Sequence, residues 1–350
     1  MEPGYKNLTM VSMNFNQSFI DYKTVTSTIV SFEVLIGSLA NGFMVTASLI
    51  DCASRRKLGS CESILICLGL SRFAFLWTLF FMYLMSVYLT SLNGKYTDAV
   101  MYIFLCFSNS SLWYATWLCM FYCVRIVNIS NCVFVVFKKN FDRCLPVLLL
   151  GSLAIVAMSV IFSLPPVYVT FHNMGNWSIS GTSSAFLFVR TNSVAFVSVS
   201  FLGSVLPFLV FCRAVIVLVV FLWKHVLKMK RQERTDYKEP SMQAYYRAAK
   251  ALGSFFLFYS FYIVAFNLYI SGIATLNNLI GCFCTMLIGS YPSVHSVFLI
   301  LQNTKLQQAL ASFQQKIRCW IRALIGILTI AHRGRIGMVC IYCIYKKSLR

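Results

Sequence analysis

Polar side chains that could bind a ligand are concentrated in one otherwise apolar stretch, residues 109–130, and in the serine just before it. Four small polar residues, 108–111, stand at its start, and Arg125 stands near its end. Small polar groups are costly against lipid, so in a membrane helix they should face the interior of a bundle or a wet cavity. An arginine near the end of a helix can reach water. One end of this helix could therefore bind a ligand, and the other end could bind a cytoplasmic partner. The alternative is that the polar residues only bond helices together.

Other apolar stretches contain single ionisable residues, namely Glu33, Arg72, Arg213 and His295. An unpaired charge at the bilayer centre costs at least about 2.5–3.5 kcal/mol, so Arg72 should be hydrogen-bonded across helices. Asn41, Ser71, Ser296 and backbone carbonyls are its candidate partners. We therefore expect an intramembrane network, which either locks the bundle or switches between two arrangements. The expected members are Glu33, Asn41, Ser71, Arg72, His295 and Ser296.

The composition is that of an integral membrane protein. Of the 350 residues 59% are hydrophobic and only 11% are charged, whereas a soluble protein has about a quarter charged residues. The formal net charge is +20, and the charged residues lie between apolar stretches. This distribution is better explained by membrane topology than by a nucleic-acid partner. The 14 cysteines lack paired CxxC spacing, so we expect neither a metal site nor a disulfide framework. No nucleophile–base arrangement indicates an enzyme, and no cofactor is implied.

Seven apolar stretches are long enough to cross a bilayer as helices, which takes about 20 residues each. They are residues 24–50, 64–89, 99–124, 145–169, 193–222, 251–273 and 279–301. Lys and Arg concentrate after the first, third and fifth stretches, which places the N-terminus outside and the C-terminus in the cytoplasm. The sequons at Asn7, Asn16 and Asn176 then lie on the outer side and are candidate glycosylation sites. The predicted fold is all-α, a seven-transmembrane helix bundle in the plasma membrane.

Four parts follow along the chain: an extracellular N-terminus (1–23), the bundle (24–302), a membrane-proximal cytoplasmic tail (303–318) and a basic, apolar extension (319–350). Apolar runs in the extension are too short to cross a bilayer. Beside basic residues, they suit an interfacial segment on an anionic inner leaflet, which makes membrane lipid an expected partner. The alternative is an accidental extension of the reading frame with no selected role.

Three motifs in the predicted helices form a specific combination. The third stretch reads Trp113-x-Ala115-Thr116-x-Leu118-x-x-Phe121-Tyr122-x-x-Arg125, the second contains Ser71-Arg72, and the seventh contains Tyr291-Pro-Ser-Val-His295-Ser296. The chain lacks Asp/Glu-Arg-Tyr after the third stretch and Asn-Pro-x-x-Tyr in the seventh, which disfavours a rhodopsin-like amine or peptide receptor. Over residues 30–313 the chain resembles the type 2 taste receptors, the bitter receptors, with Arg125 in place of the Lys of their FYxxK pattern.

The resemblance implies a G-protein-coupled receptor that senses small, often amphipathic bitter compounds and activates a heterotrimeric G protein of the gustducin/inhibitory class. It implies an outer pocket between the third, fifth, sixth and seventh helices, with Phe104, Leu105, Ser108, Asn109, Tyr262, Phe266, Tyr269 and Thr285 as candidate ligand-binding residues. The candidate coupling face comprises Arg125, Lys224, His225, Lys228, Arg247, Lys250 and Lys305. The alternatives are ordinary core or lipid contact for the aromatic residues and positive-inside anchoring for the basic ones.

The chain also departs from the family pattern, since bitter receptors often carry Trp and Asn where it has Phe104 and Ser108. These departures leave the ligand open. Two other functions stay in consideration: a vomeronasal type 1 receptor, and, from a different class, a polytopic secondary transporter. The transporter is disfavoured because there is no clear internal repeat and an odd number of stretches fits an inverted pair poorly.

Overall fold

The computed structural model describes the backbone of residues 3–56, 58–88, 94–127, 132–161, 199–232, 240–271, 273–274 and 279–332. Within these ranges, side chains are described for residues 23–56, 58–85, 99–127, 135–161, 201–224, 227, 253–269, 271, 273–274 and 279–326. The chain divides into two compact units, Met1–Phe298 and Leu299–Arg350.

Every regular element in the described residues is helical, as expected of an all-α protein. The elements are α1 (Pro3–Arg55), α2 (Ser60–Tyr88), α3 (Gly94–Ile126), α4 (Cys132–Ile161), the π-helix η1 (Val199–Val205), α6 (Leu206–Gln232), α7 (Pro240–Ile270), α8 (Leu279–Gln302) and α9 (Thr304–His332). Where their residues are described, the seven predicted stretches are helical, the fifth being divided between η1 and α6. Single helices run across the boundaries predicted at residue 23, in α1, and at residue 318, in α9.

Five of the described segments are long and apolar enough to cross a membrane: Lys23–Arg55, Ser60–Met85, Val135–Ile161, Phe201–Lys224 and Leu279–Gln302. In α7 the described apolar segment is Gly253–Tyr269. α3, which carries the polar run 108–111, is not among the five segments.

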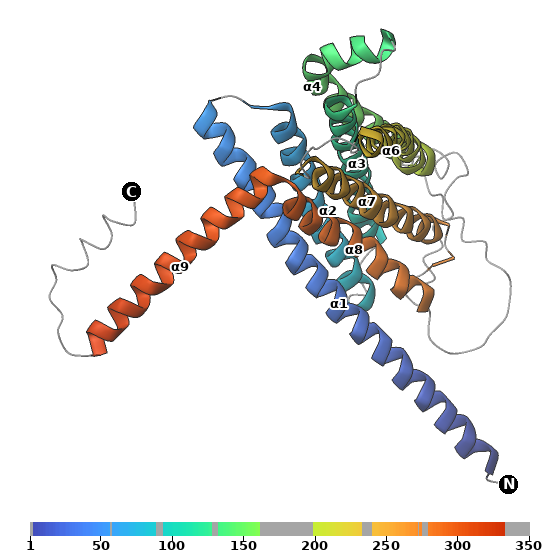
Figure 1. Ribbon diagram of the computed structural model, residues 1–350. Helices are drawn as coiled ribbons and strands as arrows, with labels where there is room; N and C mark the ends of the chain where they lie inside the picture. The colour runs from blue at the N-terminus through green and yellow to red at the C-terminus, as the bar shows by residue number, and fades with distance from the viewer. Residues whose placement is uncertain are drawn as a thin grey trace. The chain divides into compact units, whose positions relative to one another are not determined.

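α3 is the central helix of the first unit. It packs against α2, α4, η1 and α6, while α1 packs on α2 and α7 packs on α6 and η1 (Figure 1). Hydrogen bonds place α8 against α1 and α2. The central position explains why all four side chains of the polar run 108–111 are buried. Polar groups that would be costly against lipid thus lie where other helices surround them.

The outer surface of the bundle is apolar and its interior contains polar groups. Leu39, Val147 and Leu150 are 67%, 71% and 68% exposed, whereas Asn41 and Thr116 are fully buried. In water this distribution would place large apolar side chains against solvent. In a bilayer the same side chains contact lipid, and the polar groups find their partners between helices.

Close packing of α1 against its neighbours depends on Gly37. A Cβ added at this position would overlap the side chain of Leu76 in α2 and the hydroxyl of Ser293 in α8. Small residues at helix interfaces let membrane helices approach closely. Gly42, five residues further along α1, has no atom within 4 Å of an added Cβ and therefore serves as a matched control.

We predict that Gly37→Ala lowers the thermal stability of the detergent-solubilised protein and its delivery to the cell surface. Gly42→Ala should leave both unchanged or raise them, because alanine is favoured over glycine in a helix by about 1 kcal/mol. Melting temperature and surface labelling of an epitope-tagged protein measure the two effects. Equal behaviour of the two variants would contradict close packing at Gly37.

Candidate ligand-binding and coupling sites

Arg72 of α2 is 0% exposed, and four side chains on α3 and α8 hydrogen-bond it. Nε donates to Ser111 Oγ at 3.4 Å, Nη1 to Ser296 Oγ at 3.0 Å, and Nη2 to Tyr291 Oη at 3.1 Å and to His295 Nδ1 at 2.7 Å. An arginine only donates, so His295 Nδ1 accepts and the ring proton lies on Nε2. The guanidinium also lies 5.0 Å from the centre of the Tyr291 ring.

The network continues from Ser296 into α1. Ser296 Oγ donates to Asn41 Oδ1 at 2.8 Å, and Asn41 Nδ2 donates to the carbonyls of Gly37 at 2.8 Å and Pro292 at 3.4 Å. Four helices are therefore joined through one buried arginine: α2 carries it, α3 and α8 bond it directly, and α1 bonds it through Ser296. In the described residues the two ion pairs involve other arginines, so neutral groups satisfy the Arg72 charge.

The structure separates the residues that sequence reasoning placed in this network. Ser296 and His295 bond Arg72 directly, and Asn41 is one bond further away. Ser71 instead donates to the carbonyl of Leu68 in its own helix at 2.9 Å. Sequence reasoning missed Tyr291 and Ser111 as partners. Tyr291 stands four residues before His295, on the same helix face, and that spacing was a usable signal.

Glu33 and Arg213 lie outside the set of residues that bond Arg72. Glu33 Oε2 is buried without a hydrogen-bond partner and lies against the position where Gly289 would carry a Cβ. Its backbone carbonyl accepts from Ser293 Oγ at 2.8 Å, which ties α1 to α8. Arg213 is exposed on α6.

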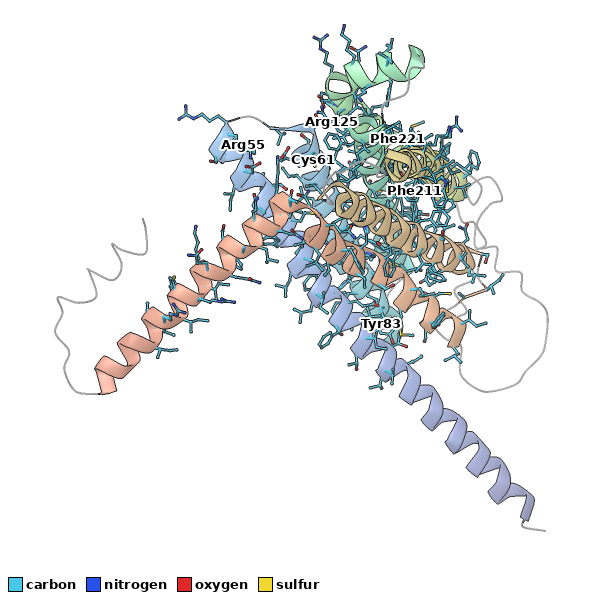
Figure 2. The ribbon with its side chains drawn as sticks, viewed as in Figure 1. Arg55, Cys61, Tyr83, Arg125, Phe211 and Phe221 are labelled. Atoms are coloured by element: carbon cyan, nitrogen blue, oxygen red, sulfur yellow. The ribbon has the colours of Figure 1, made fainter. Side chains whose placement is uncertain are left out.

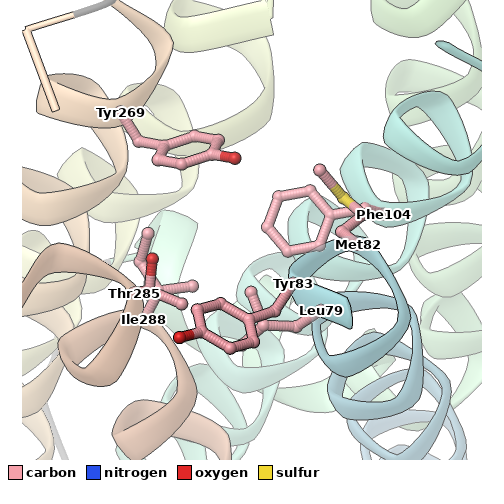
Figure 3. A pocket seen from close by; sticks show the side chains of 7 residues that line it. All are labelled: Leu79, Met82, Tyr83, Phe104, Tyr269, Thr285 and Ile288. Atoms are coloured by element: carbon pink, nitrogen blue, oxygen red, sulfur yellow. The ribbon is translucent and has the colours of Figure 1, made fainter. Parts of the chain in front are cut away.

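A small pocket lies at one end of the bundle, with a cavity volume of about 10 Å³, room for about one water molecule. Phe104 of α3 and Tyr269 of α7 face each other across it, as Figure 3 shows. The remaining lining residues are Leu79, Met82 and Tyr83 of α2 and Thr285 and Ile288 of α8. Ligand pockets usually have about 300–1,000 Å³, so side chains must move before a drug-sized molecule fits.

Three candidate ligand-binding residues, Phe104, Tyr269 and Thr285, line this pocket. The fifth helix was expected to contribute to it, but the walls come from α2, α3, α7 and α8. The three lining residues of α2 were missed, and nothing in their types or spacing distinguishes them from ordinary core. Leu105, also a candidate, is buried, but it is not among the lining residues.

Aromatic side chains continue inward from the pocket. The ring of Phe104 lies 5.3 Å from that of Phe75 and 6.5 Å from that of Phe266, and Phe266 stacks on Tyr262 at 5.5 Å. The Tyr262 hydroxyl is buried beside Ser108. Tyr262 also contacts Tyr291 at 5.0 Å, so the aromatic residues below the pocket touch the Arg72 network directly.

The other end of α3 carries an ion pair. Arg125 Nη2 lies 3.1 and 3.0 Å from the two carboxylate oxygens of Asp142 in α4, and Ser60 of α2 donates to the same carboxylate at 2.6 Å. Arg125 and Asp142 are 56% and 54% exposed, so the pair contributes at most about 1 kcal/mol. Figure 2 shows Arg125 at the opposite end of the bundle from the pocket residue Tyr83.

The remaining candidates on the coupling face and the sequons are less fully described. Lys224 on α6 is exposed, and so is Lys305 in the second unit. Four coupling candidates, His225, Lys228, Arg247 and Lys250, have side chains outside the described residues. Among the candidate glycosylation sites, Asn176 lies outside the described residues altogether, and the side chains of Asn7 and Asn16 are likewise not described.

An apolar helical bundle with a polar interior is the architecture of a helical membrane protein. The sequence profile of the Taste receptor protein (TAS2R) family matches residues 20–318. Taste receptor type 2 member 102 of Mus musculus is 31% identical over 345 residues, covering 97% of this chain and 100% of that protein. Member 31 of Gorilla gorilla gorilla is 29% identical over 85% of this chain and 95% of its own length. Member 39 of Papio hamadryas is 30% identical over 85% of this chain and 88% of its own length.

The chain therefore belongs to the taste receptor protein family. It is a bitter taste receptor, a G-protein-coupled receptor of the seven-transmembrane type, and not an enzyme. As a family member with several apolar helices, it is a multi-pass protein of the plasma membrane. The match favours this function over the vomeronasal receptor and the transporter.

We predict that Arg72→Ala severely reduces folded receptor at the cell surface. The change removes the donor from four buried acceptors on α3 and α8, at about 1–3 kcal/mol for each buried group left unsatisfied. Ser296→Ala should lower stability less, because it leaves only one Arg72 N–H and the Asn41 side-chain oxygen without their hydrogen bonds to Ser296. Ser31→Ala is the control, since that exposed hydroxyl bonds only the Ser27 carbonyl in its own helix. Thermal melting and surface labelling should rank the variants in this order, and a wild-type-like Arg72→Ala would contradict the network.

Proposed function

We propose that a small, amphipathic bitter agonist binds at the pocket end of the bundle and that the Arg125 end contacts the G protein. The observation that carries this proposal is the separation of the two candidate sites along α3. Phe104 lines the pocket and Arg125 follows it by 21 residues, which is about 31 Å of helix at 1.5 Å per residue. No single small ligand can touch both.

The ligand-binding residues that we propose combine aromatic area with few polar groups. Phe104, Tyr262, Phe266 and Tyr269 offer apolar surface, and Ser108, Asn109 and Thr285 offer hydrogen bonds that can orient an amphipathic molecule. Because the pocket is narrow in this conformation, an agonist must favour a more open arrangement. Activation is then a population shift towards the arrangement in which the ligand binds better.

The basic residues support the orientation and the partner that we propose. Lys and Arg gather after the first, third and fifth stretches, which supports a cytoplasmic location of the Arg125 end and an extracellular N-terminus. We expect the partner there to be a heterotrimeric G protein of the gustducin/inhibitory class. Arg125, Lys224, His225, Lys228, Arg247, Lys250 and Lys305 are the proposed contact residues. Asn7, Asn16 and Asn176 remain proposed glycosylation sites on the outer side.

We predict that changes at the two ends act differently on agonists. Phe104→Ala, Ser108→Ala and Tyr262→Phe should shift the half-maximal dose of some agonists and not of others, because each ligand makes its own contacts. Arg125→Ala and Lys224→Ala should lower the maximal response to every agonist while competition binding stays nearly unchanged. The measurement is a dose–response matrix against at least three unrelated agonists in cells that supply an inhibitory-class G protein, corrected for surface receptor.

Asp142→Asn is the matched control for the coupling end. It weakens the ion pair with Arg125 but leaves the arginine in place. If Arg125 acts by contacting the G protein, Asp142→Asn should keep the maximal response that Arg125→Ala loses. Agonist-selective effects at Arg125 together with uniform effects at the pocket would overturn both assignments.

We propose that α9 lies on the inner membrane surface. Phe313, Ile317, Trp320 and Leu324 are exposed and recur at helical spacing on one face, while Lys316, Arg318 and Arg322 lie outside that face. An apolar face bordered by basic residues suits an anionic leaflet. The family profile ends at residue 318, but the alignment with the mouse relative leaves only about 3% of the chain uncovered and so extends beyond it.

We predict that the segment after residue 318 contributes to membrane association but not to ligand recognition. Truncation after Arg318 should keep the half-maximal agonist dose within about threefold, a change of roughly 0.7 kcal/mol. Dose–response curves of the truncated and full-length receptors at matched surface levels measure this. A truncated receptor that reaches the surface and fails to signal would give the extension a direct role in activation.

A further inference from the structure

Three polar side chains on one face of α3 point towards the fifth predicted stretch. Asn109, Trp113 and Thr116 are spaced four and three residues apart, so they follow one another along the same side of the helix. Trp113 Nε1 donates to the carbonyl of Leu202 at 3.2 Å, and the Thr116 hydroxyl is shared between the carbonyls of Leu112 in its own helix at 2.9 Å and Pro207 at 3.1 Å. Two of the three are therefore satisfied by backbone groups of η1 and α6.

The local structure of η1 explains why a carbonyl is available there. In a π-helix the carbonyl of residue i pairs with the N–H of residue i+5, which for Leu202 is residue 207. Residue 207 is proline and has no N–H to donate. The Leu202 carbonyl is thus free to accept from Trp113, and this pairing fixes η1 against α3.

Asn109 differs from its two neighbours on this face. It is 0% exposed, yet neither Nδ2 nor Oδ1 has a hydrogen-bond partner in the described part of the chain. Its amide packs against Gly203 of η1, where an added Cβ would overlap it. Tyr259 of α7 lies beside Thr116, further along the same side of α3. The unpaired amide of Asn109 lies between α3 and η1.

We propose that the Asn109 amide recognises neutral agonists that carry a carboxamide or a lactam. A side-chain amide presents a donor and an acceptor side by side, and a second amide is the group that pairs with both. Gly203, which packs against the amide, and Trp113, one turn further along the same face of α3, are uncharged, which favours a neutral ligand. Arg72, the buried cation of the bundle, is already bonded by four side chains.

Asn109 is one of the ligand-binding residues proposed above, but it does not line the small pocket. Phe104 lines that pocket, and Asn109 follows it by five residues, which places the two side chains about 140° apart around α3. Because Gly203 packs directly against the amide, a ligand reaches the amide only when η1 moves aside. Amide binding then favours the displaced arrangement, as an agonist must. The inference rests on the proposed function, since it names the ligand class of the same receptor.

The test uses pairs of compounds that differ only in the amide N–H, such as a lactam and the cycloalkanone of equal ring size, or an aryl carboxamide and the aryl methyl ketone. Wild-type receptor should respond to the amide member at the lower dose. Asn109→Leu keeps the side-chain shape and removes both unpaired polar atoms, so surface delivery should be maintained. We expect it to raise the half-maximal dose of the amide member at least tenfold, about 1.4 kcal/mol, and that of the ketone less than threefold.

Two further variants keep the test independent of folding. Gly203→Ala should displace the Asn109 amide and selectively weaken the response to the amide compound of each pair. Asn109→Ala removes the amide and should have the same selective effect. Thr116→Val is the matched control, because it removes the bond to Pro207 and should affect both members of each pair equally.

Three outcomes are decisive. A selective loss for amide members supports the inference. The inference would be overturned if Asn109→Leu affected both compounds of a pair equally, or if the wild-type receptor did not distinguish them. A structural water would then be the partner of the Asn109 amide. A wild-type receptor that responds to no compound in a broad screen of bitter substances would instead overturn the proposed function itself.

Discussion

The satisfaction of one buried guanidinium constrains the whole bundle. Arg72 is fully buried, and in the described residues uncharged groups bond it: Ser111, Tyr291, His295 and Ser296. Because leaving such a charge unbonded inside a membrane is expensive, α3 and α8 must present these groups at the level of Arg72. Asn41 extends the same constraint to α1. The rotation of four helices about their axes is thereby determined by one side chain.

Tyr291 connects this network with the ligand end of the bundle. Its hydroxyl accepts from Arg72 at 3.1 Å, and its ring lies 5.0 Å from that of Tyr262. Tyr262 in turn stacks on Phe266, next to the pocket residue Phe104. His295, another Arg72 partner, stacks on Phe255 of α7 at 4.1 Å. Since aromatic contacts join α7 to the network at two points, a ligand that moves α7 also changes the surroundings of Arg72. Bonds of this kind have discrete arrangements, which a switch requires.

The interface between α3 and the fifth stretch shows how local backbone defects create specificity. The π-helix and Pro207 together leave the Leu202 carbonyl free for Trp113, which fixes the two elements side by side. In the same interface Gly203 provides the space that the Asn109 amide occupies. The irregular backbone of η1 thus provides a hydrogen-bond acceptor for Trp113 but leaves the amide of Asn109 unpaired. Such departures from regular helix are often found at functional sites.

The sequence by itself determined the all-α class, the positions of the seven apolar stretches and, through the motifs, the family. Those properties depend on local composition, because a run of about 20 apolar residues must form a helix in lipid whatever its neighbours are. It also predicted Ser296 as a partner of Arg72. The roles of Tyr291 and Ser111, the contribution of Leu79, Met82 and Tyr83 to the pocket, and the unpaired state of Asn109 were decided only by the tertiary structure. The physical reason is that hydropathy is nearly the same in every direction around α1, α2, α3 and α4. It therefore says that a segment crosses the membrane but not which face meets which neighbour, and contacts between packed side chains settle that rotation.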